Sequence, residues 1–117
     1  MEVRMRFDMN NPHLDIEPVF DDIVITFKEE RVVTEDQIDQ IATDIIKLAE
    51  QSPGKWITLD FKRVKFLSSA FLGFLVKLQK TVTQGRGRLK LRNLNQDIYK
   101  VFKITHLHKI LTIETAS

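Results

Sequence analysis

The pattern of hydrophobic and polar positions divides the chain into short strands and amphipathic helices. Two β-prone runs, residues 14–20 and 23–27, flank the turn-forming pair Asp21-Asp22 and predict a hairpin. Three later runs have the length and the branched or alternating composition of further strands: residues 56–61, 88–92 and 110–113. The pattern therefore predicts five strands, the first two of them paired with each other.

Between these strands, apolar residues recur with helical spacing. The clearest helix begins after Thr34, which can cap it while Gln37 completes a capping box, and it ends near Gln51. A second helix is predicted from Ser68-Ser69 to about Thr83. Its core-facing stripe consists of Phe71, Phe74, Leu75, Leu78 and Val82.

A third helix is predicted after Asn93 or Asn95, either of which can cap it. It carries Ile98, Val101, Phe102 and Thr105. The resulting order, β-β-α-β-α-β-α-β, predicts one α/β domain over residues 1–117 with a largely parallel sheet and crossover helices.

The first segment, residues 1–13, allows two interpretations. Val3, Met5 and Phe7 alternate with charged residues, as in a short strand, before the turn-like sequence of residues 9–12. The segment is therefore either an N-terminal arm or an extra edge strand.

Composition excludes several classes of protein. The 18 basic and 16 acidic residues give a net charge of +2, which does not indicate a dedicated polyanion binder. The absence of cysteine excludes disulfides and thiolate metal sites. Because the sequence shows neither a signal peptide nor a run of apolar residues that could span a bilayer, we expect a cytoplasmic protein.

Catalytic patterns are scarce. For His13, His106 and His108 we favour solvated loop positions over a metal site, because no carboxylate or thiolate accompanies them in a ligand motif. Asp60 ends a predicted strand without a second group for acid–base work. No glycine motif for nucleotide phosphates is present. We therefore expect no enzymatic activity, no metal and no cofactor.

A basic alternation follows the second helix. Arg86, Arg88, Lys90 and Arg92 occupy every second position, so on a strand they project from one face. The simpler interpretation is a solvated outer face of the sheet. The more specific one is a surface that binds nucleic acid or an anionic membrane. We favour the solvated face, since no aromatic residue interleaves to stack on bases.

The segment around Ser68 and Ser69 invites a regulatory interpretation. In the first turn of a helix, free amides and the positive end of the dipole can receive the charge of a phosphate. From the residues alone, a simple helix cap is favoured over a phosphorylation site. Leu72 and Val76 lie on a flank of this helix, where they either pack on a neighbour or extend an apolar patch beside Ser69.

From about Leu14 to Glu114, the sequence resembles the STAS domain family, whose best-known members are bacterial anti-sigma-factor antagonists. The similarity includes the hairpin, the Thr34 helix, the segment of residues 57–70 and the glycine turn before residue 88. The resemblance implies an α/β fold with a small mixed sheet and helices packed on one side. It also implies a non-enzymatic protein that binds a kinase-like anti-sigma factor.

The resemblance also singles out individual residues. Ser69 corresponds to the family's phosphorylated serine, whereas Ser68 stands at its aspartate position and Phe71 at its glycine position. Arg31 stands at an acidic position of the family before the first helix. The implied partner-binding surface consists of Ser68, Ser69, Ala70, Phe71, Leu72 and Val76.

Three hypotheses follow. The first is an anti-sigma-factor antagonist switched by phosphorylation at Ser69. The second is a STAS docking subunit of a larger signalling or transport assembly that works without phosphorylation. The third, from a different class, is nucleic-acid or anionic-membrane binding through the basic stripe at residues 86–92.

Overall fold

The computed structural model describes residues 11–114, so the predicted arm or edge strand at residues 1–13 lies almost entirely outside the described residues. The elements follow in the order β1 (Leu14–Val19), β2 (Asp22–Phe27), β3 (Arg31–Val32), α1 (Glu35–Glu50), β4 (Trp56–Asp60), β5 (Phe66–Leu67), α2 (Ser69–Gln84), β6 (Arg88–Arg92), α3 (Gln96–Ile104), the 3₁₀ helix η1 (Leu107–Lys109) and β7 (Thr112–Glu114). The predicted hairpin, strands and helices are present. The short strands β3 and β5 were not predicted.

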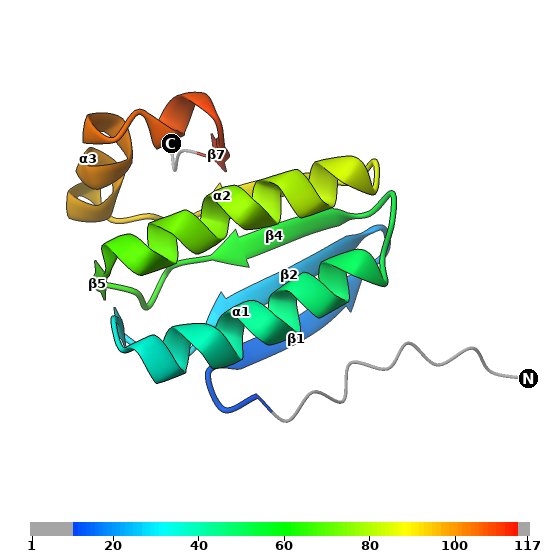
Figure 1. Cartoon of the computed structure of the whole chain (residues 1–117), viewed down its shortest axis with the longest axis horizontal. Coiled ribbons are helices and arrows are strands. Elements are labelled where there is room, and N and C mark those ends of the chain that lie inside the picture. Colours follow the sequence, from blue (N-terminus) through cyan, green and yellow to red (C-terminus); the bar gives the residue numbers. More distant parts are fainter. Residues whose placement is uncertain (1–10, 115–117) are drawn as a thin grey trace, which may run out of the picture.

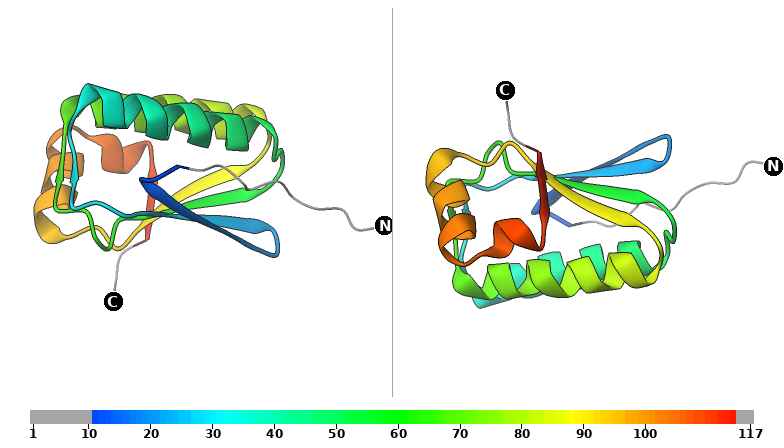
Figure 2. Two further views of the ribbon diagram at one scale, coloured as in Figure 1. Left: turned by 90° about the horizontal axis from the view of Figure 1, so that it is seen from below. Right: turned by 90° about the horizontal axis from the view of Figure 1, so that it is seen from above.

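Five strands form one mixed sheet in the order β1-β2-β4-β6-β7 (Figure 1). β1 is antiparallel to β2, and the other neighbours are parallel. Right-handed crossovers carry α1 and α2 onto the same face of this sheet (Figure 2). The predicted small mixed sheet with helices packed on one side is confirmed, and α3 lies at the end of the sheet where β6 leaves it.

Short polar side chains fix where the helices begin. Thr34 Oγ1 accepts a hydrogen bond from Gln37 N at 3.2 Å, and Gln37 Oε1 accepts one from Thr34 N at 3.3 Å. The predicted capping box is therefore confirmed. At α3 the cap is Asn95 rather than Asn93, with Asn95 Oδ1 accepting from Ile98 N at 2.8 Å.

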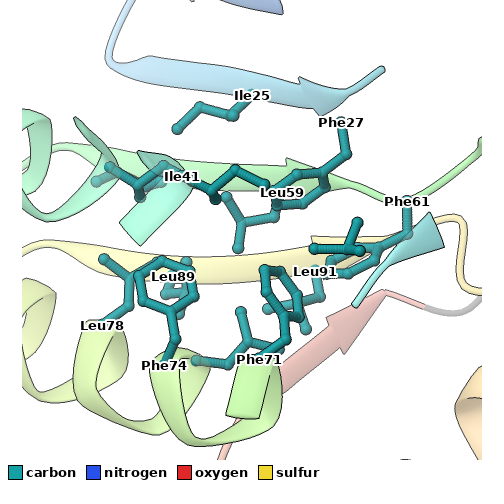
Figure 3. Close-up of a cluster of buried hydrophobic side chains, with 14 of the residues drawn as sticks. Ile25, Phe27, Ile41, Leu59, Phe61, Phe71, Phe74, Leu78, Leu89 and Leu91 are labelled. Carbon is teal, nitrogen blue, oxygen red and sulfur yellow. The ribbon is translucent and has the colours of Figure 1, made fainter. Parts of the chain in front are cut away.

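The core fills the space between the sheet and the pair α1 and α2. It is richest in aromatic rings at the end where β2 and β4 finish (Figure 3). The ring of Phe27 lies 5.0 Å from that of Phe61 and 5.5 Å from that of Phe71, between centroids, at tilted and edge-on angles. These geometries are favourable for aromatic pairs, so the start of α2 is anchored to the sheet by Phe71.

The C-terminal elements differ in detail from the predicted pattern. Ile98 and Phe102 are buried, but Val101 is 37% exposed, because α3 covers only the end of the sheet and buries a narrow stripe. The last strand begins at Thr112 instead of residue 110, since residues 107–109 form the 3₁₀ turn η1.

Candidate functional site

The ribbon of β3 and β5 positions the turn at Ser68 and Ser69. Its two strands are parallel, and β3 leads into α1 while β5 leads into α2. Ser68 N donates to Val32 O at 3.1 Å, and Phe66 N donates to Glu30 O at 3.0 Å. The ribbon therefore holds the beginnings of the two helices side by side, at the left end of the molecule in Figure 1.

The two serines have different roles in the structure. Ser68 has extended backbone geometry, with φ −95° and ψ 165°, and its Oγ accepts from Phe71 N at 3.4 Å. Ser68 is thus the N-cap of α2. Ser69 is the first residue of the helix and is exposed. Its position beside the unpaired first amides and the positive dipole end suits an added negative charge.

A buried carboxylate fixes the loop that leads to this turn. Asp60 is 2% exposed and accepts from Lys62 N at 2.9 Å, from Asn93 Nδ2 at 3.0 Å and from Arg92 Nε at 3.1 Å. Burial alone would raise the pKa of Asp60, but these hydrogen bonds and the Arg92 charge outweigh it and lower the pKa. The ionised carboxylate of Asp60, at the end of β4, therefore connects β4 to β6 and to the following loop through hydrogen bonds.

Exposed basic side chains lie on the ribbon and in the loop that precedes it. The guanidinium of Arg31 lies 4.7 Å from the centroid of the Phe66 ring, which is 52% exposed. Lys62 and Arg63 are exposed in the loop before β5, and Lys65 lies 3.8 Å from a carboxylate oxygen of Glu30. Arg31 and Phe66 thus form an exposed cation–π pair in the strands that lead to the candidate phosphoacceptor.

Two residues of the predicted partner surface do not lie on the surface. Phe71 is fully buried, and Leu72 is 9% exposed and belongs to the core. The expectation that they contact a partner is corrected, because both side chains belong to the core, where Phe71 packs on the rings of Phe27 and Phe61. Ser69 and Ala70 are exposed, whereas Ser68 and Val76 are partly buried.

The basic stripe is only partly a free surface. Arg86 lies in the turn before β6, at φ +64°, and so does not share the strand face. Lys90 lies 3.5 Å from Glu114, and Arg92 contacts Asp60. On the helix-free face, however, Trp56 of the neighbouring strand lies within 5.6 Å of Arg88 and 5.4 Å of Lys90, an aromatic neighbour that spacing along one strand does not reveal.

His13 lies apart from the neighbouring pair His106 and His108. His13 contacts Glu29 at 2.8 Å near the start of β1, while His106 and His108 flank the first residue of η1 with their rings 6.4 Å apart. Within residues 11–114 no group of three or more potential metal-ligating His, Cys, Asp or Glu side chains occurs. In the same part of the chain, the helices are too short or too polar to cross a membrane.

A groove between α1 and α2 was not predicted from the sequence. It has a volume of about 710 Å³, and it begins at Ala70, the residue after Ser69. The available signal was a set of small residues on the facing sides of the two helices, at Ala42, Ala70 and Gly73. Helical spacing placed them near the core stripes but did not show that the space above them is open.

Comparison with known proteins agrees with this architecture. The family model described as "STAS domain" matches residues 17–117. An anti-sigma-B factor antagonist of Bacillus subtilis (strain 168) is 36% identical over 73 residues, which are 62% of this chain and 65% of that protein. The chain thus matches slightly less than two thirds of the length of this curated relative.

Two solved structures share the fold. The anti-sigma-factor antagonist (STAS) domain protein of Planctomyces limnophilus has a TM-score of 0.80 at 20% identity, covering 89% of this chain and 91% of that chain. The Bacillus cell fate determinant SpoIIAA in its phosphorylated form has a TM-score of 0.70 at 22% identity, covering 89% and 91%. Because the family model matches residues 17–117, well over half of the sequence, the chain belongs to the STAS domain family.

Proposed function

We propose that this protein is a non-enzymatic regulator that binds a kinase-like anti-sigma factor through the turn at Ser68 and Ser69. The observation that carries the proposal is the exposed Ser69 at the first position of α2, held by the ribbon and the Ser68 cap. The similarity to an anti-sigma-B factor antagonist supports the choice of partner class.

We further propose that phosphorylation of Ser69 weakens this contact. A phosphate adds about −1.5 to −2 charges at neutral pH and carries three acceptor oxygens. The basic residues Arg31, Lys62 and Arg63 on the ribbon side suit an acidic partner surface. A phosphate at Ser69 would repel such a surface.

The phosphorylation step is tested by incubating the protein with its cognate anti-sigma-factor kinase and mapping the product by mass spectrometry. We expect one phosphate on Ser69 in the wild type and none in Ser69→Ala. Ser68→Ala is the matched control, because it removes the neighbouring hydroxyl and leaves Ser69 in place. Phosphate on another residue, or none at all beside a control substrate that the kinase does modify, would refute the switch.

Partner binding is measured separately with purified anti-sigma factor by titration calorimetry. Ser69→Asp should bind at least about tenfold more weakly than wild type, equivalent to about 1.4 kcal/mol, while Ser69→Ala should stay within about threefold. Circular dichroism checks that both variants are folded. Equal affinity for all three proteins would contradict the charge switch without contradicting the contact itself.

A docking role without phosphorylation is the second candidate. It is favoured by the uncharged Ser68, which caps the helix where antagonists of the family carry an aspartate. On this reading the same turn binds a subunit of a larger assembly. The kinase experiment separates the two, since a docking subunit would bind its partner and remain unmodified at Ser69.

A further inference from the structure

The groove between α1 and α2 is an open, elongated surface beside Ser69. Its α1 side runs from Glu35 to Glu50, and its α2 side runs from Ala70 to Lys77. Both helices begin at the ribbon (Figure 1), and Glu35 and Ala70 from their first turns line the groove. No part of the fold described above fills it.

The middle of the groove is apolar and shallow-walled. Ile38 and Phe74 are buried beneath it, Ala42 and Ile46 are half-buried, and Gly73 is exposed. A Cβ built at Gly73 would meet nothing within 4 Å, so the space above this residue is free. An apolar strip of this shape between two helices suits the apolar face of a third helix.

Charges differ between the two ends of the groove. Glu35 and Asp39 line the half of the groove beside Ser69, while Lys77, Lys47 and the single acid Glu50 follow in that order from its middle to its far end. A helix with basic residues at one end and acidic residues at the other would match both ends in only one direction.

The direction follows from the charges of the helix itself. Isolated helices are stabilised by acidic residues at the N-terminus and basic residues at the C-terminus. Such a helix meets Glu35 and Asp39 with its basic C-terminal end when it runs antiparallel to α1 and α2. We propose that the groove binds an amphipathic helix of the protein partner, acidic at its start and basic at its end, in this antiparallel direction.

This inference rests on the proposed function for the identity of the partner. The proposed helix binding and the proposed phosphate switch, however, act on different sides of the turn. The phosphate switch concerns the ribbon side, where Arg31 and Lys62 lie. The groove side presents Glu35 and Asp39, so an added negative charge at Ser69 should not weaken a helix whose basic end lies there.

The probe is a synthetic helical peptide of 16 residues, the length of α1, with Glu in its first turn, a Leu and Ile stripe, and Lys in its last turn. Its binding to the full chain is followed by fluorescence anisotropy, and the site is mapped by amide chemical shifts. We expect saturable binding, with shifts at Ala42, Gly73 and Lys77.

Two pairs of variants give matched controls. Gly73→Gln should weaken binding of the peptide at least about tenfold by filling the groove. Gly73→Ala makes the same backbone change with a single methyl group, so its affinity for the peptide should stay within about threefold of the wild-type value. Lys77→Glu should weaken binding of the peptide severalfold. Lys80→Glu, on the same helix but outside the groove, should leave this binding unchanged.

Several results would overturn the proposal. These are absence of saturable binding, shifts confined to the ribbon or to α3, or equal effects within either pair of variants. Concentration-dependent shifts at Gly73 without peptide would show that a second copy of the chain covers the groove instead. Ser69→Asp should leave the peptide affinity unreduced, so a failed phosphorylation assay and a failed groove assay are distinguishable.

Discussion

Phe71 shows how much one residue beside the candidate site contributes to the fold. Its ring is fully buried and contacts the rings of Phe27, Phe61 and Phe74 at centroid distances of 5.5, 6.2 and 5.5 Å. Phe71, which the sequence resemblance places at the family's glycine position, is thus a core residue in this chain. Any change at Phe71 acts on the site through the stability of the first turn of α2.

Replacing Phe71 with Ala should cost about 3–5 kcal/mol of unfolding free energy, because it leaves a cavity in the core. The nearby exposed ring offers a control, since Phe66→Ala should cost less than about 1 kcal/mol. Urea unfolding of the two variants measures the difference. Similar losses for both would contradict the burial of Phe71.

The sequence predicts the roles of some residues correctly and those of others only in part or not at all. The sequence predicts Thr34 as a cap because the capping box is a local pattern of four residues. The sequence allows Phe71 a place both in the core stripe and on the partner surface, since helical spacing gives the angle of a residue around the helix axis but not what covers the start of the helix. Trp56 next to Arg88 could not be found, because strand neighbours are set by sheet order.

At the scale of elements, the N-cap and the candidate phosphoacceptor are adjacent but separable. Ser68→Ala removes the side-chain acceptor for Phe71 N and should cost about 0.5–2 kcal/mol, with about 1 kcal/mol as the central value. Ser69→Ala should change stability by less than about 0.5 kcal/mol, since Ser69 is an exposed first-turn residue.

Thermal or denaturant unfolding of these two variants gives the comparison. A larger loss for Ser69→Ala than for Ser68→Ala would show that Ser69 is the cap and would reverse the assignment of roles. The comparison also provides the stability baseline for the phosphorylation experiment with the same proteins.

The long elements could be predicted, and the short ones could not. Each long helix has at least two turns of regular spacing, and the strands β2, β4 and β6 have β-prone cores. The ribbon of β3 and β5 has two residues per strand, so it has no periodicity to detect. The groove could not be predicted either, because it depends on where α1 and α2 lie relative to each other, and spacing along the sequence does not give that.

At the scale of the whole molecule, Asp60 links acid stability to the shape of the site. Its pKa is lowered in the fold, so its carboxylate is ionised more readily when folded than when unfolded. The stability that it contributes is complete above the unfolded pKa of about 3.9 and is lost as the pH falls through the lower folded value.

At neutral pH, the free energy of unfolding of Asp60→Asn should therefore be about 1–3 kcal/mol lower than that of the wild type, because Arg92 loses its buried charged partner. Below about pH 4 the difference from wild type should shrink, since protonation removes the same charge in the wild type. Denaturant unfolding between pH 7 and pH 3 checks both statements. A difference that stays constant over this range would exclude the titration of Asp60 as its cause.

A single residue, Ala70, separates the exposed Ser69 from Phe71 in the core, and this spacing limits how an enzyme can reach the serine. A kinase that requires an extended substrate strand would have to pull the first turn of α2 open and expose Phe71, an opening that costs much of the global stability. A kinase that recognises the folded surface needs no such opening. Modification of Ser69 should therefore depend on a native fold, and a short linear peptide of this sequence should be a poor substitute for the protein.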